Sequence, residues 1–416
     1  SLLNNLFDLS RKIGVETNIQ FLFVLGISMF VLLVVSIAFK ALTNYVQLSF
    51  SFMRQYSLGK RMIEGYLHQP FSWFLNRHSA DIGKTLISEV GQVVNKCLNP
   101  SLSLIQHILI TLAILIILIL VNLKIALIVG LTLGSAYGIL YLLTRSLIIK
   151  IGKERLNASK LLFITVAEAF GAIKEIKVGG SEKNFVNKFS APAKNLARTQ
   201  ALLGLISTLP RFALEAVTFG GIILVILYFI AQSGNFNDII PTIALYVFAG
   251  YRLMPALQGI FRSAAEIRYA KPVLDILYED LKNLKSTVLI KDENRLQLKK
   301  NITLKNIFYK YPKSSKTVLN NLSLNIDVNS KTGIVGATGS GKTTIVDIIL
   351  GLLELQKGGL EVDGKLIEKK NLRNWQNLIG YVPQNIFLVD DTVSANIAFG
   401  VENNKINQQN VERAAK

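Results

Sequence analysis

A glycine-rich stretch in the last third of the chain constrains its fold more than any other feature. Residues 336–344 read Gly-Ala-Thr-Gly-Ser-Gly-Lys-Thr-Thr and match the pattern G-x-x-x-x-G-K-[ST] at every fixed position. A short apolar run at 333–335 precedes the stretch and predicts a buried strand, and residues 345–353 predict a helix. Strand, glycine loop and helix are the context that this motif requires, which disfavours a glycine turn that binds nothing.

The residue types of this loop suit a nucleotide phosphate. Glycines let backbone N–H groups approach a phosphate without an intervening Cβ, and the helix N-terminus adds a favourable partial charge. We expect Lys342 to contact the β- and γ-phosphates of ATP, and the Thr343 hydroxyl to bind Mg²⁺. The predicted cofactor-binding residues of the loop are Gly336, Thr338, Gly339, Ser340, Gly341, Lys342, Thr343 and Thr344.

The composition indicates a membrane protein. Half of the 416 residues are hydrophobic, yet the formal charge is +19, as expected for apolar spans joined by basic loops. The basic residues are dispersed between long apolar runs, so we expect no nucleic-acid partner. The single Cys97 excludes an internal disulfide. His68, His78 and His107 have no metal-ligand spacing and are predicted to lie in loops or on the surface.

Five apolar segments are long enough to cross a ~30 Å hydrocarbon core as helices. They predict spans at about 19–45, 102–121, 124–145, 210–231 and 238–260. One very long helix is the alternative for the second and third segments, but it would greatly exceed the bilayer thickness.

The loops predict a topology. Residues 40–100 and 145–211 are rich in Lys and Arg and should be cytoplasmic, whereas 122–124 and 232–238 should be outside. Residue 1 is then outside. We therefore expect a first span to be missing from the sequence, with a cleaved signal as the alternative.

The pattern changes after the last span. Residues 266–300 are charged and mixed, which predicts a linker. Alternating short strands follow, with a hairpin turn at Asp363-Gly364. The predicted strands are 302–309, 322–326, 333–335, 360–362 and 379–382. The predicted fold is therefore a polytopic α-helical membrane domain over 1–265, with five of six spans, and a partial α/β phosphate-loop domain over 301–416.

Four sequence motifs follow one another in this second domain. Phe-Tyr-Lys-Tyr-Pro at 308–312 is followed by the glycine loop, by Tyr-Val-Pro-Gln at 381–384, and by a stretch at 391–400. With the spans before them, they resemble an ATP-binding-cassette (ABC) exporter over nearly the whole chain. The resemblance implies that Tyr311 stacks on adenine and that Gln384 contacts Mg²⁺ and the γ-phosphate side. The alternatives are a strand-end core aromatic and an ordinary loop glutamine.

The resemblance also implies features that the sequence does not contain. A Leu-Ser-Gly-Gly-Gln signature, a Walker B glutamate and a switch histidine are expected beyond Lys416, so no catalytic residue is present. We therefore expect weak nucleotide binding without hydrolysis from these residues, and ATPase activity from the full-length parent. Residues 74–84 and 169–178 are similar to coupling regions that contact the ATPase domain. Amphipathic helices with a solvated face are the alternative.

The substrate is indicated only by the last span. Tyr-Arg-Leu-Met-Pro at 251–255 resembles the segment in flippases for lipid-linked oligosaccharides, where a second arginine follows seven residues on. That position is Gly259 here. Arg252 is a candidate substrate contact, and equally a residue that snorkels to the interface.

The predicted function is that of a half-transporter. It would pair with a second copy in a bacterial-type plasma (inner) membrane, with its ATPase domain in the cytoplasm, and use ATP to export or flip a lipid-linked or amphipathic substrate. The alternatives are a nucleotide-binding membrane protein without ATPase activity and an importer built on the same fold.

Overall fold

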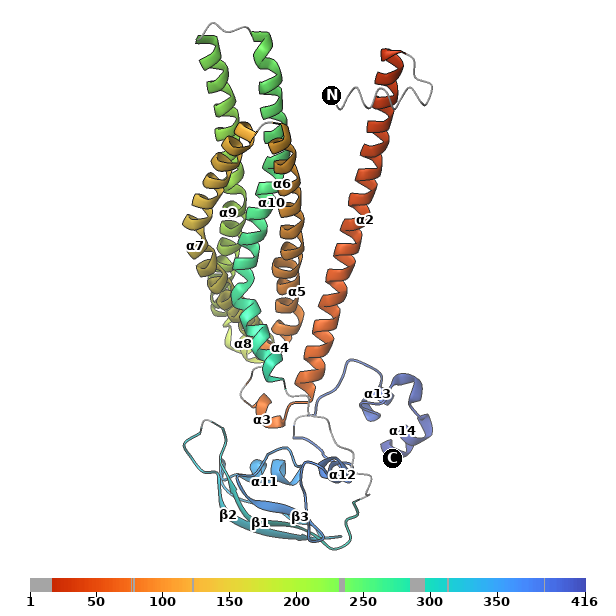
Figure 1. Cartoon of the computed structure of the whole chain (residues 1–416). Coiled ribbons are helices and arrows are strands. Elements are labelled where there is room, and N and C mark those ends of the chain that lie inside the picture. Colours follow the sequence, from red (N-terminus) through yellow and green to blue (C-terminus); the bar gives the residue numbers. More distant parts are fainter. Residues whose placement is uncertain are drawn as a thin grey trace. The chain divides into compact units, whose positions relative to one another are not determined.

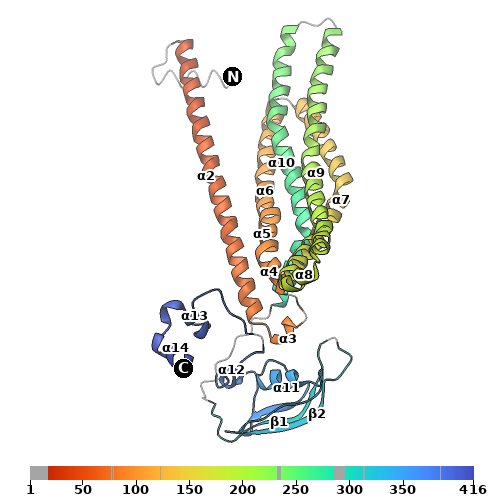
Figure 2. The same cartoon turned by 180° about the vertical axis from the view of Figure 1, so that it is seen from behind.

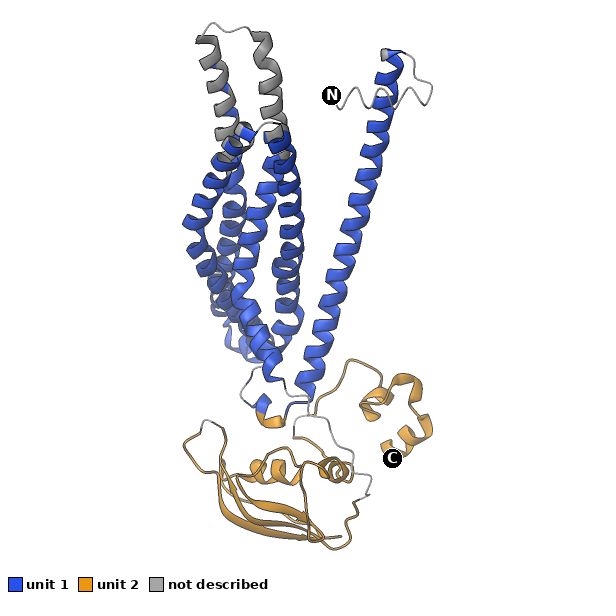
Figure 3. Ribbon diagram, viewed as in Figure 1, with its two compact units in different colours: residues 1–69, 73–287 blue, residues 70–72, 288–416 orange. Residues whose placement is uncertain are grey.

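The computed structural model in Figure 1 describes residues 17–75, 77, 79–121, 123–231, 236–284, 296–312, 314–384 and 386–416. The chain divides into two compact units, coloured separately in Figure 3. The first unit comprises residues 1–69 and 73–287 and is helical. The second comprises residues 70–72 and 288–416 and contains the β-sheet.

Long helices form the first unit, and each continues past the apolar segment that predicts it. They are α2 (Asn18–Leu67), α6 (Asn99–Val121), α7 (Leu123–Gly171), α9 (Glu182–Ala231) and α10 (Phe236–Asn283). Figure 2 shows α6, α9 and α10 side by side. Because α6 and α7 are separate helices that pack against each other, one continuous helix over the second and third apolar segments is excluded.

Shorter helical segments connect the long ones. They are α3 (Phe71–Phe74), α4 (Ser79–Lys84), the π-helical η1 (Thr85–Glu89), α5 (Val90–Val93), the π-helical η2 (Val94–Leu98) and α8 (Ile173–Gly179). Both stretches that resemble coupling regions therefore contain a short helix, α4 in one and α8 in the other. Their proposed contact with the ATPase domain stays a prediction.

Much of the helical surface is apolar. Two stretches of the described residues, Ile19–Leu67 and Ser79–Leu120, are long and apolar enough to cross a membrane, by length and composition. Phe30 and Leu120 illustrate the surface, since they are 67% and 80% exposed. Such a surface is costly in water and matches hydrocarbon chains. The span count of five stays a prediction.

Two apolar clusters hold the first unit together. One lies among α6, α7, α9 and α10 and includes Leu118, Ile148, Leu203, Phe261 and Tyr269. The other joins the C-terminal end of α2 to α5 and α10 through Met62, Tyr66, Val90, Val273 and Leu277.

The predicted linker at 266–300 is partly wrong, because residues 266–283 are the last turns of α10. Tyr269, Val273 and Leu277 are buried and recur every four residues, so they lie on one face of the helix. The charged residues between them mask this period in the sequence. Residues 285–295 of the predicted linker lie outside the described residues.

The second unit contains a four-stranded antiparallel sheet in the order β2-β1-β3-β4. The strands are β1 (Asn301–Tyr309), β2 (Leu319–Asp327), β3 (Lys357–Val362) and β4 (Lys365–Leu366). In Figure 1, α11 (Lys342–Ile349) and α12 (Leu372–Gln376) cover one face of the sheet. The shared core includes Leu304, Ile307, Ile348, Val362 and Trp375. The remaining helices are α13 (Val393–Ile397), η3 (Asn403–Lys405) and α14 (Gln408–Ala415).

Two of the predicted strands are not strands in this structure. Residues 333–335 and 379–382 pair with no strand among the described residues. Val335 is 92% exposed and Val382 is 86% exposed. A strand forms only where a neighbour accepts its backbone hydrogen bonds, so an apolar run alone does not specify one. The predictions for β1, β2 and β3 are confirmed within a few residues at their ends.

The predicted turn at Asp363-Gly364 is confirmed as the connection between β3 and β4. Both residues have positive φ, 50° and 78°, as a type I′ hairpin turn requires. The Asp363 carboxylate accepts hydrogen bonds from the backbone N–H groups of Lys299 and Lys300 at 2.7 Å and of Asn301 at 3.0 Å. One side chain thereby ties the hairpin to the start of β1.

This carboxylate should make the second unit sensitive to acid. The N–H group of Lys299, with those of Lys300 and Asn301, holds the Asp363 pKa below its usual value. The stabilisation is therefore complete above the ordinary aspartate pKa of ~4 and is lost as the pH falls through the lower folded pKa. We expect Asp363→Asn to lower the thermal midpoint at pH 7. The midpoint of this variant should then fall less on acidification than that of the wild type.

Thermal unfolding of the chain between pH 7 and pH 3 measures this effect. Asp390→Asn, at an exposed aspartate of the same unit, is the matched control. Parallel acid sensitivity of the wild type and Asp363→Asn would contradict the assignment.

Candidate nucleotide-binding site

The glycine loop leads directly into α11, which confirms a helix after the loop, although α11 begins three residues before the predicted 345–353 and ends four residues before its end. Gly341 is the residue before α11 and has a φ of 95°, which a side chain would strain. A Cβ on Gly341 would also lie 3.0 Å from Leu319 Cδ2 and 3.1 Å from Val318 Cγ1. The loop can therefore turn into the helix only with glycine at this position, and the first N–H groups of α11 are left for an anion.

Lys342 folds back over the loop. Its ammonium donates hydrogen bonds to the carbonyl oxygens of Gly336 at 2.8 Å and of Ala337 at 2.9 Å. An ammonium has three donors and no acceptor. The two bonds thus hold the charge beside the loop, where a β- or γ-phosphate oxygen can replace a carbonyl.

Thr343 and Thr344 occupy different environments although they are adjacent. Thr343 is exposed and its hydroxyl can reach a ligand, which fits the predicted Mg²⁺ contact. Thr344 is 3% exposed, and its hydroxyl lies 3.0 Å from the Tyr311 hydroxyl. Among the described residues, no group of three or more His, Cys, Asp and Glu side chains could hold a metal. The predicted Mg²⁺ contact of Thr343 stays a prediction.

Tyr311 is brought to the loop by this hydrogen bond. The centroid of its ring lies 5.1 Å from that of Tyr309, with an interplanar angle of 85°, and the ring packs on the domain core. It also lines a cavity of about 760 Å³ with Phe308, Pro312, Lys357 and neighbouring residues. One face of the Tyr311 ring thus packs on the core, as expected if Tyr311 is only a core aromatic. The other face borders a space large enough for a nucleobase, as expected if Tyr311 stacks on adenine.

Burial sets the electrostatics around the start of α11. Burial raises the pKa of the Asp347 carboxyl. Burial also raises the pKa of the Tyr309 hydroxyl, with smaller contributions from Tyr311 and Asp347. Both groups therefore keep their protons to a higher pH than they would in water.

Two further predicted site residues lie outside the loop in the sequence, Gln384 in the second unit and Arg252 in the first. Gln384 is exposed and lies in a segment without regular secondary structure. No hydrogen bond joins Gln384 to the loop among the described residues, so its predicted contact with Mg²⁺ stays a prediction. Arg252 belongs to α10, but its side chain lies outside the described residues.

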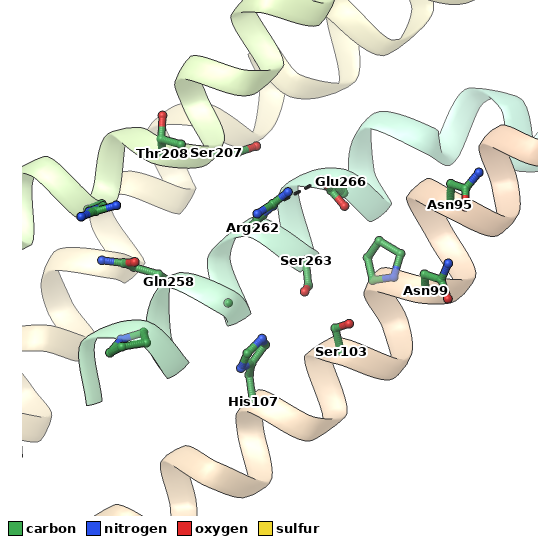
Figure 4. Close-up of a pocket in the computed structure, with 14 residues that line it drawn as sticks. Asn95, Asn99, Ser103, His107, Ser207, Thr208, Gln258, Arg262, Ser263 and Glu266 are labelled. Atoms are coloured by element: carbon green, nitrogen blue, oxygen red, sulfur yellow. Dashed lines mark ion pairs between the residues drawn. The ribbon is translucent and has the colours of Figure 1, made fainter. Parts of the chain in front are cut away.

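A polar cavity in the first unit, shown in Figure 4, was not predicted from the sequence. His107, predicted to lie in a loop or on the surface, instead faces a cavity between α6, α9 and α10. A signal was present in the sequence. Asn95, Asn99, Ser103 and His107 recur every four residues and so share one face of a helix.

We expect Tyr311→Ala to weaken ATP binding by about 5- to 100-fold, the range for loss of one base–aromatic stack. Tyr311→Phe is the matched control, because it keeps the ring and loses only the hydrogen bond to Thr344. Titration of the chain with a fluorescent ATP analogue measures both affinities. Unchanged affinity in Tyr311→Ala would show that the ring is a core residue only.

Comparison with known proteins decides the family. The ABC transporter family model matches residues 319–416, which include the glycine loop. An ATP-dependent lipid A-core flippase of Cupriavidus metallidurans is 25% identical over 362 residues, covering 85% of this chain. Residues 319–416 therefore belong to the ABC transporter family. In this chain the helical unit precedes the unit that contains the family match, and the predicted membrane and ATPase domains stay predictions.

Other known proteins are similar over different shares of the chain. A flippase of the same description from Photorhabdus laumondii is 28% identical over 198 residues, covering 46% of this chain and 33% of the relative. The structure of a bacterial Atm1-family ABC exporter with ATP bound shares the fold, with a TM-score of 0.72 and 18% identity. That likeness covers 91% of this chain and 67% of the other. The chain spans 59% of the Cupriavidus relative and 60% of a second flippase, from Cupriavidus pinatubonensis.

Proposed function

We propose that this chain is the core of a half-transporter that uses ATP and Mg²⁺ to export or flip a lipid-linked or amphipathic substrate. The observation that carries the proposal is the loop at the start of α11, where Lys342 is held over the carbonyls of Gly336 and Ala337. A long-helix unit with an apolar surface precedes it in the same chain. The flippase relatives support an amphipathic substrate.

The proposed assembly is a homodimer in a bacterial-type plasma membrane, with the ATPase unit on the cytoplasmic side. The excess of Lys and Arg in 40–100 and 145–211 supports this orientation. In the proposed cycle, ATP binding closes the two ATPase domains, short helices such as α4 and α8 pass the closure to the spans, and hydrolysis resets them.

Flipping in proteoliposomes tests the proposal. The exporter is expressed from its complete gene and reconstituted with a fluorescent amphipathic lipid, and ATP is added from outside. We expect the probe to move from the leaflet facing the ATPase domains to the opposite leaflet, only when ATP and Mg²⁺ are present. Movement in the reverse direction would favour an importer. Nucleotide binding without ATP turnover would favour the binding-only alternative.

A further inference from the structure

Three segments of the helical unit meet at one carboxylate, that of Asp280 in the last turn of α10. Arg77, which follows α3, donates hydrogen bonds from Nη2 to Oδ1 at 3.0 Å and from Nη1 to Oδ2 at 3.4 Å. Tyr66, in the last turn of α2, donates from its hydroxyl to Oδ2 at 2.9 Å. Both carboxylate oxygens are therefore bound, and the end of α10 is joined to the end of α2 and to the segment that follows it.

The Trp73 ring of α3 also contacts the guanidinium. Arg77 Cζ lies 4.2 Å from the centroid of this ring, within the range of a cation–π interaction. The ring centroids of Trp73 and Tyr66 are 5.2 Å apart. Arginine suits this position because its planar group can bind a carboxylate through two N–H groups and also stack on a ring, whereas a lysine ammonium acts as a point charge. We refer to Tyr66, Trp73, Arg77 and Asp280 as the Asp280 junction.

The centre of the Asp280 junction is shielded from water. Tyr66 is 2% exposed, and the side chains of Asp280 and Arg77 are 13% and 37% exposed. A mostly buried carboxylate is costly unless donors and cations surround it, so loss of Arg77 would leave Asp280 poorly compensated. We therefore expect this ion pair to hold more tightly than an exposed pair such as that of Lys60 with Glu64.

The place of Asp280 in its helix also indicates a role in positioning. The C-terminal end of a helix carries partial negative charge, so an aspartate in the last turn is unfavourable by itself. The cation that compensates Asp280 is Arg77, which lies outside α10. Asp280 thus disfavours the end of α10 on its own and stabilises it only through the tie to another segment.

Two of the joined segments are those expected to communicate with the second unit. The helix α10 ends at Asn283, and residues 288–416 of the second unit follow, with the glycine loop. Arg77 lies within residues 74–84, which resemble a coupling region, and α2 leads into this region. A movement of the end of α10 would therefore be passed to Arg77 and to α2 for as long as the Asp280 junction holds.

We propose that Asp280 is a positioning residue that couples ATP use to transport. Through Arg77 and Tyr66, it makes the end of α10, the segment with Trp73 and Arg77, and the end of α2 move as one body. The inference rests on the proposed function, since coupling requires that ATP drives transport. Asp280 acts through its neighbours and contacts neither nucleotide nor substrate. Its loss should therefore spare ATP binding and lower the amount of transport per ATP consumed.

Transport per ATP in proteoliposomes tests this role. The exporter from its complete gene is reconstituted with a fluorescent amphipathic lipid, and lipid movement and phosphate release are measured in the same sample. We expect Asp280→Asn to lower the ratio of lipid moved to phosphate released by about 2- to 30-fold, the range for residues that alter the coupling of two sites. Its affinity for a fluorescent ATP analogue should match the wild type. Glu279→Gln, at the exposed acidic neighbour on α10, is the matched control and should keep the wild-type ratio.

Two rescue variants separate positioning from a general folding defect. Asp280→Glu keeps the carboxylate and should keep most of the wild-type ratio of lipid moved to phosphate released. Arg77→Asp should lower this ratio as Asp280→Asn does. Adding Asp280→Arg to Arg77→Asp should recover most of the loss, because the exchanged charges can pair again. Two independent folding defects would add in this double variant instead of cancelling.

Hydrogen exchange tests the Asp280 junction without nucleotide. The chain is placed in phosphatidylcholine nanodiscs, and exchange is followed at the backbone amides of 73–75 and 77. These amides should exchange faster in Asp280→Asn than in the wild type, because the segment loses its tie to α10. In Glu279→Gln they should exchange at the wild-type rate.

Three results would overturn the inference. They are a wild-type ratio of lipid moved to phosphate released in Asp280→Asn, no recovery of that ratio in the charge-exchange variant, and equal hydrogen exchange in Asp280→Asn and the wild type. An exporter that moves no lipid in its wild-type form would overturn the proposed function and this inference with it. A wild-type ratio in Asp280→Asn would overturn the inference alone, so the two failures are distinguishable.

Discussion

Lys342→Ala should weaken ATP binding by about 10- to 100-fold and abolish ATP-driven transport. The lysine is the only residue of the loop that brings a full positive charge, and its ammonium is already held beside the loop by the carbonyls of Gly336 and Ala337. A charged hydrogen bond contributes about 1.5–3 kcal/mol, and each 1.4 kcal/mol corresponds to tenfold in affinity. Transport should fall further than affinity, because charge stabilisation matters most when the phosphoryl group is transferred.

Two assays measure the effect. Titration of the chain with a fluorescent ATP analogue reports affinity, and phosphate release by the exporter from its complete gene reports turnover. Lys365→Ala, at an exposed lysine of β4 in the same unit, is the matched control and should match the wild type. Unchanged ATP turnover in Lys342→Ala would rule out the proposed ATPase role.

Glu89→Ala should destabilise the helical unit by about 3–5 kcal/mol, the usual range when a buried ion pair loses one partner. Glu89 is 3% exposed and ends η1. Its carboxylate binds Arg155 Nη1 of α7 at 2.6 Å and Lys84 Nζ of α4 at 3.2 Å. Arg155 and Lys84 are also buried, at 4% and 6% exposed. The substitution would therefore leave two cations away from water with no anion beside them.

Thermal unfolding in detergent, monitored through the accessibility of the Cys97 thiol, measures this loss of stability. Glu64→Ala is the matched control, because Glu64 pairs with Lys60 at 3.8 Å with both side chains more than half exposed. An exposed pair contributes at most about 1 kcal/mol. Adding Arg155→Ala to Glu89→Ala should reverse part of the decrease in the thermal midpoint, since it removes one unpaired cation. Equal thermal midpoints for Glu89→Ala and Glu64→Ala would show that the ion pairs of Glu89 with Arg155 and Lys84 do not stabilise the helical unit.

Local patterns in the sequence predicted the features that depend on a few neighbouring residues. The glycine loop and α11 were predictable because Gly341 needs a positive φ and a helix must start at Lys342. The turn at Asp363-Gly364 was predictable because both residues tolerate positive φ. The break between α6 and α7 was predictable because a helix over both segments would exceed a bilayer.

Features that depend on distant residues were not predictable in this way. The extent of α10 past residue 265 is set by Val273 and Leu277, which pack on Met62 and Val90 from other helices. The polar face of α6 could be read from its four-residue period, but not which helices it faces. That Gly259 leaves room for His107 depends on the packing of α6 on α10.

Long apolar helices followed by a glycine loop could be predicted from the residues alone, because helix period, span length and glycine spacing are local properties. Which polar groups meet depends on the packing of the folded chain. This packing placed Tyr311 beside Thr344, enclosed Glu89 between two cations, and gathered polar faces of α6, α9 and α10 around one cavity. Except for Lys84 beside Glu89, these juxtapositions join residues tens to more than a hundred positions apart, and chain packing, which no local pattern encodes, brings them together.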